Sequence, residues 1–150
     1  MTKLTKSIKD HRKSVIDLEK KLLSLVDDKS IVAGDSNVFP LKHTFVHGIY
    51  VREMRMKKET FLIGKIHQHD HIWFLLSGHL MIATDEKTKE YVAPCYVKAS
   101  AGSKRAIYAL EESLWVNVHP NPSNTEKLET LEEEIIAKNY LQYEKIKQLK

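Results

Sequence analysis

Apolar residues repeat at helical spacing at the start of the chain. Positions 4, 8, 11, 15, 18, 22 and 25 are separated alternately by three or four residues, and mostly Lys, Asp, Ser and Glu lie between them. This spacing is typical of the a/d seam of a coiled coil. It predicts a helix over residues 1–28 that joins copies of the chain through Leu4, Ile8, His11, Val15, Leu18, Leu22 and Leu25. Packing of the same stripe on the rest of its own chain is an equal alternative, because a helix of this length needs a partner.

The pattern changes after a linker at 29–41, which contains Gly34 and Pro40. From 42 to 119, short runs rich in β-branched and aromatic residues alternate with turns such as Ser77-Gly78-His79. The predicted strands are 43–47, 49–56, 61–67, 72–76, 80–84, 91–92, 96–99, 105–110 and 114–119. No stretch between them is long enough for a crossover helix, so we expect a mainly β fold with antiparallel strands.

A second helical segment is predicted over 120–150. Pro120 and Pro122 end the β region because proline removes a backbone donor. Ser123 followed by Glu126 resembles a capping box, so a helix is expected to begin there, with Asn139 as a candidate point of interruption. The 150 residues therefore form one domain, a β-barrel flanked by helices.

Composition limits the setting in which this domain works. The single cysteine, Cys95, cannot form an internal disulfide, and no apolar run has the length of a membrane span, which favours a cytoplasmic protein. The net charge of +4 is modest. Basic residues concentrate near the N-terminus without interleaved aromatics, so the sequence favours a solvated helix face over nucleic-acid binding, and no membrane partner is expected.

Histidines form the main chemical signal. His67, His69 and His71 alternate along an extended segment that continues the predicted strand 61–67, and side chains two residues apart in such a segment project from the same face. They could converge on one divalent transition metal ion such as Zn, Fe, Mn or Ni, because imidazole nitrogen suits these metals. His119 at the end of the last strand is a further candidate ligand. Hydrogen bonding within a polar barrel mouth, with no cofactor, is the alternative.

Two segments resemble the signature motifs of the cupin superfamily. The first runs from Gly64 to Gly78 and the second from Val97 to Ala109. The resemblance implies a cupin-type jelly-roll barrel and a metal site that includes His67 and His69. The family's glutamate position is occupied here by His71, and Arg105 stands where the fourth histidine belongs.

Arg105 changes the expected chemistry of the site. Its guanidinium stays protonated, cannot ligate a cation and suits a carboxylate or phosphate. An anion-binding sensor is therefore one functional hypothesis. Tyr50, Trp73 and Tyr108 are expected to line the same pocket if their faces turn inward.

The series from Phe39 to Met54, the two altered motifs and the acidic tail together resemble small cupin-like proteins encoded by tailed bacteriophages. The broken ligand set and the heptad seam favour a non-enzymatic, homo-oligomeric structural or assembly protein. The phage resemblance implies a viral origin but no particular function. Under the assembly hypothesis, a viral protein is expected to be a virion component with other virion proteins as partners, located in the host cytoplasm or the virion. A metal-dependent isomerase, lyase or oxygenase that uses the histidines is the alternative.

Overall fold

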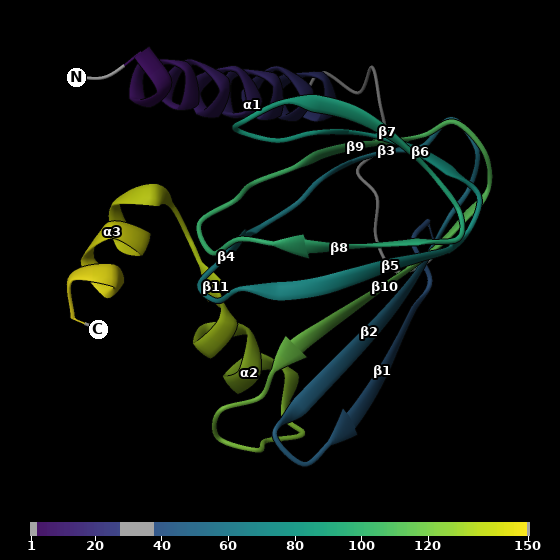
Figure 1. The fold of residues 1–150 in the computed structure, drawn as a ribbon, viewed down its shortest axis with the longest axis vertical. Coiled ribbons are helices and arrows are strands. Elements are labelled where there is room, and N and C mark those ends of the chain that lie inside the picture. The colour runs from purple at the N-terminus through teal and green to yellow at the C-terminus, as the bar shows by residue number, and fades with distance from the viewer. Residues whose placement is uncertain (1–2, 28–37, 150) are drawn as a thin grey trace.

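Most of the chain folds into antiparallel β-structure, with helices before and after it (Figure 1). The computed structural model describes residues 3–27 and 38–149, and in the first of these segments the side chains of 9–25. The mainly β prediction with flanking helices is confirmed. Most of the predicted linker at 29–41 lies outside the described residues.

One sheet has five strands in the order β1-β2-β10-β5-β8, and every neighbouring pair is antiparallel. Its strands are β1 (Leu41–Val46), β2 (Ile49–Met56), β5 (His71–Ser77), β8 (Cys95–Ala99) and β10 (Ser113–Pro120). Strand β10 lies at the centre of this sheet, with β2 on one side and β5 on the other.

The opposing sheet has four strands in the order β3-β9-β6-β7, again antiparallel. Its strands are β3 (Phe61–Ile63), β6 (His79–Ala83), β7 (Thr88–Val92) and β9 (Ala106–Ala109). Gly78 connects β5 to β6 at a φ of 92°. A Cβ at Gly78 would lie 2.6 Å from Ser113 Cα, so both the backbone angle and the space require glycine.

Apolar side chains fill much of the space between the two sheets. This core contains Met54, Met56, Trp73, Leu75, Leu80, Ile82, Ala99, Ile107, Ala109 and Trp115. Trp73 and Trp115 pack against each other with ring centroids 4.7 Å apart. The half-buried Cys95 packs at the edge of this core.

The C-terminal segment forms two helices with a short strand between them. They are α2 (Leu128–Ile135), β11 (Ile136–Ala137) and α3 (Tyr140–Gln148), and β11 pairs with β4 (Ile66–His67). The predicted start at Ser123 is wrong, because α2 begins at Leu128. The side chain of Asn121 bonds both the carbonyl oxygen and the N–H of Thr125, and these two bonds hold residues 121–125, which come before α2, in a loop. Asn139 does interrupt the segment: its side chain accepts a hydrogen bond from Gln142 N and caps α3.

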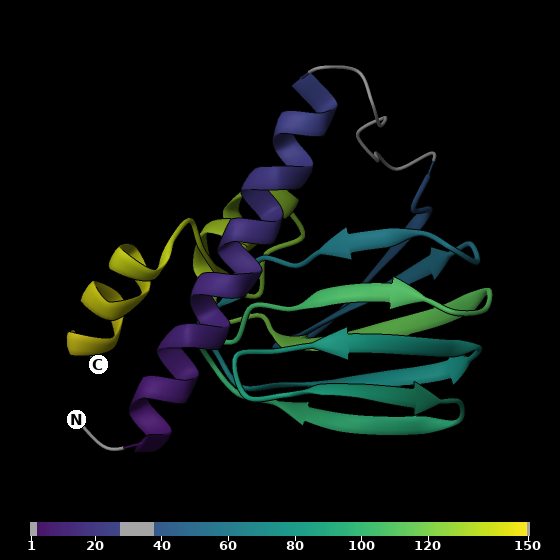
Figure 2. The same cartoon turned by 90° about the horizontal axis from the view of Figure 1, so that it is seen from above.

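Helix α1 (Lys3–Asp27) crosses one end of the barrel, the end near which the C-terminal helices also lie (Figure 2). Arg12 lies 3.2 Å from Asp85 and over the ring of Tyr140, and Lys104 pairs with Glu19 at 2.8 Å. Among the predicted seam residues, Val15 is buried, Leu18 is 38% exposed, and His11, Leu22 and Leu25 are half-buried. The side chains of Leu4 and Ile8 lie outside the described residues. The seam therefore packs at least partly on its own chain.

None of the helices in the described residues combines the length and apolar character needed to cross a bilayer.

Candidate metal and ligand site

Three histidine rings meet inside the barrel, one from each of three strands. His67 ends β4, His71 begins β5 and His119 lies near the end of β10. Their ring centroids are 4.3 to 4.8 Å apart, and one nitrogen from each ring lies within 4.8 Å of the others. All three are at most 4% exposed. Strand pairing explains the convergence, because Val118 lies opposite Ile72 and the next position along brings His119 beside His71.

His69 does not belong to this group, contrary to the strict alternation assumed from the sequence. The predicted strand 61–67 is broken into β3 and β4, and residues 68–70 form a bend before β5. The bend turns Gln68 and His69 toward the C-terminal segment, where Gln68 Nε2 donates to Ile136 O at 2.8 Å and His69 Nε2 lies 3.3 Å from Glu134 O. His67 and His71, four residues apart, are brought together instead.

The three buried rings are held in the neutral form. Burial lowers the pKa of His67 well below its usual range, and neighbouring His71 and His119 lower it further. Burial together with Arg105 lowers the pKa of His71 to about 4, and burial together with His71 lowers that of His119 to about 2. Metal ions bind the neutral imidazole, so this environment keeps the rings in the binding form near pH 7.

Arg105 lies beside the histidines. Its Nη2 is 3.4 Å from His71 Nε2 and 3.2 Å from Ser103 Oγ, and the residue is 6% exposed. The Nδ1 of His71 lies 3.3 Å from the carbonyl oxygen of His69, which assigns the ring proton to Nδ1 and leaves Nε2 as the acceptor. Burial lowers the pKa of Arg105 to about 10, so the guanidinium remains charged near pH 7.

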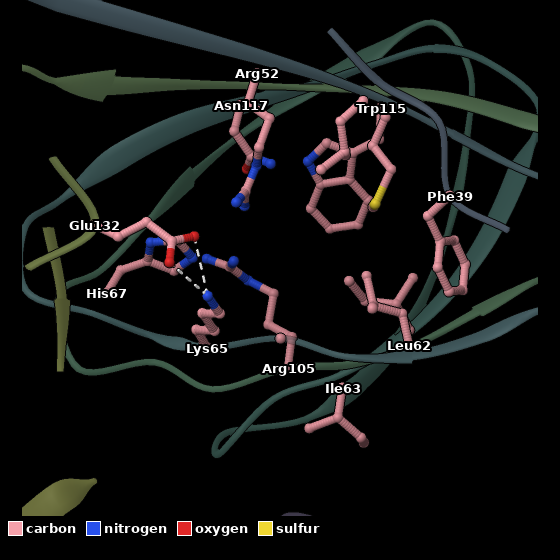
Figure 3. Close-up of a pocket in the computed structure, with 14 residues that line it drawn as sticks. Phe39, Arg52, Leu62, Ile63, Lys65, His67, Arg105, Trp115, Asn117 and Glu132 are labelled. Atoms are coloured by element: carbon pink, nitrogen blue, oxygen red, sulfur yellow. Dashed lines mark hydrogen bonds and ion pairs between the residues drawn. The ribbon is translucent and has the colours of Figure 1, made fainter. Parts of the chain in front are cut away.

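A cavity of about 350 Å³ adjoins the histidines on the side of His67 and Arg105. Figure 3 shows Arg52 and Asn117 entering it from one side and Arg105 from the other, with the bonded pair Lys65 and Glu132 near His67. Arg52 and Asn117 lie opposite each other on the neighbouring strands β2 and β10. The far wall is apolar and includes Phe39, Leu62 and Trp115. One end of the cavity is thus cationic and the other hydrophobic.

The other predicted pocket residues do not line this cavity. Tyr50 is buried behind His119, with ring centroids 5.9 Å apart, and its hydroxyl bonds His43 Nδ1 at 2.8 Å. Trp73 belongs to the apolar core and, together with Arg105, lines a second pocket of about 320 Å³. Tyr108 alternates with the buried Ile107 and Ala109, which places it on the opposite face of β9. His43 therefore reaches the site only through Tyr50.

Arg52 and Asn117 were missed by the sequence reasoning, although a signal existed. Trp115, Asn117 and His119 alternate along the last predicted strand, so they share a face just as the alternating histidines were expected to do. The same alternation could have found Arg52, which lies between Tyr50 and Met54 on one face of its strand.

The residues present fit a bound metal. His67 Nδ1 and His119 Nε2 are buried without a hydrogen-bond partner among the described residues. An unpaired buried polar atom costs free energy, and a metal ion would use these nitrogens. Trp115 Nε1 and Asn117 Oδ1, two more buried atoms in the same condition, belong to residues that line the cavity.

The sequence comparisons and the structural comparison differ sharply. No protein-family model and no curated protein matches the chain. KdgF from Halomonas sp. superposes with a TM-score of 0.51 at 12% identity, over 59% of this chain and 84% of that one. A cupin 2 conserved barrel domain protein from Salinispora arenicola gives 0.51 at 14% identity, over 71% and 92%. A cupin superfamily protein from Desulfitobacterium hafniense gives 0.50 at 12%, over 61% and 84%. The barrel has the cupin fold.

In this cupin barrel the donor set differs from the pattern that the sequence resemblance implied. His71, at the motif's glutamate position, joins His67, whereas His69 of the expected His-x-His pair turns away. His119 completes the trio from the last strand. Arg105, at the position of the fourth histidine, lies next to the trio as a cation.

Proposed function

We propose that this protein is a metal-dependent, small-molecule-binding cupin in which His67, His71 and His119 hold one divalent transition metal ion. The observation that carries the proposal is the convergence of three buried imidazoles, two of which have a ring nitrogen without a partner in the described part of the chain. A three-nitrogen site leaves coordination positions open for a ligand.

Each part of the barrel has a separate task in this proposal. A bound ion would supply Lewis-acid polarisation of a coordinated oxygen. Arg105 donates to His71 Nε2 when no ion is present and would turn to a bound anion otherwise. The β4–β11 pair and the bonds of Gln68 to the C-terminal segment close the barrel over the rings and restrict water. The reaction classes compatible with such a site are isomerisation, lyase and oxygenase chemistry.

Metal analysis of tag-free protein tests the proposal. After loading with Zn, Mn, Ni or Fe(II) and removal of excess, we expect about one equivalent per chain for one of these metals. His119→Gln should reduce that content severalfold, whereas His47→Gln, at an exposed position, should leave it unchanged. Less than about a tenth of an equivalent in the loaded native protein would contradict the proposal.

The assembly role expected from the sequence, including a phage virion component, remains a prediction. The contacts of α1 with its own barrel support the intramolecular alternative, while Leu18 at 38% and Leu23 at 58% exposure leave apolar surface for a second chain. Light scattering on the full chain and on Leu18→Glu tests this role, with Ser14→Glu as the control on an exposed position of α1. A monomer in all three samples argues against assembly through α1.

A further inference from the structure

The buried end of Arg105 lacks an acidic partner. No carboxylate of the described residues lies within 4.0 Å of its guanidinium, and its bonded side chains, Ser103 and His71, are uncharged. A buried charge without a counter-ion is costly, and arginine does not relieve this cost by losing its proton near pH 7. An anion bound beside Arg105 would offset this cost.

Arg52 adds a second cation to the same cavity. It lies on the inward face of β2 opposite Asn117, and it has no ion pair within the chain segments that the structure describes. The remaining charges of the cavity, Lys65 and Glu132, neutralise each other through two bonds of 2.9 Å. Among the described residues, neither Arg52 nor Arg105 has a carboxylate within 4.0 Å, and Asp85 acts on Arg105 only from a greater distance. The planar forks of the two guanidinium groups match a carboxylate.

The apolar part of the cavity fits an organic anion better than an inorganic one. Its wall beyond the arginines contains Phe39, Met54, Leu62, Ile107 and Trp115, and none of these offers a charge. The volume of about 350 Å³ is at the lower end of the range for small-molecule pockets. Trp115 lines this cavity, and its buried Nε1 has no hydrogen-bond partner among the described residues.

We propose that this cavity binds a small organic acid, with its carboxylate between Arg105 and Arg52 and its apolar body against Phe39, Leu62 and Trp115. The inference rests on the proposed function in naming a ligand for that site, but the arginines alone suffice for binding. An anion beside Arg105 would also compensate the repulsion between this guanidinium and an ion at His71.

Calorimetric titration with 3-phenylpropanoate tests the inference, on chelator-treated protein and again on metal-loaded protein. We expect 3-phenylpropanoate to bind the metal-free protein saturably. The neutral 3-phenylpropanamide should bind at least about tenfold more weakly, since one hydrogen-bonded charge is lost. Acetate and inorganic phosphate should also bind more weakly than 3-phenylpropanoate, because neither fills the apolar wall. Equal binding of the amide and the acid overturns the inference.

Variants locate the site. Arg52→Gln should weaken 3-phenylpropanoate about tenfold, whereas Arg55→Gln, on the same strand and exposed, should not. Arg105→Gln should weaken it similarly, and Arg105→Lys should restore only part of the affinity because lysine lacks the planar fork. Circular dichroism verifies folding, and Arg52→Gln decides if the Arg105 variants do not fold.

The failures of the two proposals are separable. A protein that binds 3-phenylpropanoate but no metal overturns the proposed metal function and leaves the acid subsite standing. A protein that binds metal at the histidines but shows no arginine-dependent binding of 3-phenylpropanoate overturns the acid subsite alone.

Discussion

The two ends of the barrel interior are equally buried but differ in how their atoms are satisfied. At one end Trp73, Leu75 and Leu80 are at most 2% exposed and pack against other apolar groups. At the other end His67 and His119 are at most 4% exposed, yet each has a ring nitrogen that bonds to none of residues 3–27 and 38–149. Burial alone therefore does not distinguish the apolar core from the candidate site, and it is the ring nitrogens that set these histidines apart from Leu75 and Leu80.

Strand β10 runs through both ends and shows how the change occurs. Its inward face carries Trp115 in the apolar core, then Asn117 and His119 at the polar end. At the polar end, buried atoms such as His119 Nε2 have no partner among the residues that the structure describes, and each such atom costs free energy. Such local conflicts are expected where a protein binds a ligand.

The largest expected effect is at the apolar end. Leu75→Ala should lower the free energy of unfolding by about 2–5 kcal/mol, because Leu75 is 0% exposed and its loss leaves a cavity. Leu76→Ala, the next residue on the opposite face at 53% exposure, is the control and should cost about 1 kcal/mol or less. Urea unfolding measures both. Equal losses in the two variants would show that the sheets are not packed as described.

A bound metal ion should stabilise the native protein through contacts at the polar end alone. At a free metal concentration a hundred times the dissociation constant, the native protein should gain about 2.7 kcal/mol. His71→Gln should lose most of this gain, while His79→Gln, on the β6 side of the Gly78 turn, should keep it. Thermal unfolding with and without metal measures the difference. The same gain in His71→Gln as in the native protein would place the ion elsewhere.

The pH dependence of the metal-free protein distinguishes the two ends further. The pKa of His119 is lowered to about 2 in the folded state, so below its unfolded pKa of about 6.5 only the unfolded chain takes up a proton there. Stability is consequently lost as pH falls. Between pH 7.5 and 5, His119 should account for a loss of about 2 kcal/mol in the free energy of unfolding.

His119→Gln should therefore lose about 2 kcal/mol less than the native protein over that pH interval. The exposed His47→Gln should follow the native curve. Urea unfolding at pH 7.5 and pH 5 tests this. Identical pH dependence in the native protein and His119→Gln would mean that the ring is not held neutral.

The smallest effect is expected at Arg105. Arg105→Met removes a buried cation that has no carboxylate within 4.0 Å among the described residues, so the metal-free, ligand-free protein should be unchanged or more stable by about 1 kcal/mol. Urea unfolding at pH 7.5 measures it. A loss of several kcal/mol would mean that Arg105 stabilises the fold and is not reserved for a ligand.

The strands could be predicted because their alternation is local. The run 49–56 matches β2 in full, and the glycine turn at Gly78 lies where the sequence placed it. His67, His71 and His119, which the structure brings together, were all among the candidate ligands, and Arg105 lies 3.4 Å from His71.

What could not be predicted depends on contacts between distant residues. The bend that turns His69 away forms because β4 pairs with β11, about seventy positions further along the chain. The late start of α2 results from the Asn121 loop, which a capping-box pattern does not reveal. Tyr108 could not be assigned to a face because its strand is short and apolar throughout.

The most direct measurement is an anomalous difference map from crystals of the metal-loaded protein, recorded at the absorption edge of the metal. We expect one strong peak per chain, bounded by His67, His71 and His119. A loaded crystal with its metal at another position, or with no peak among these three rings, would contradict the central claim.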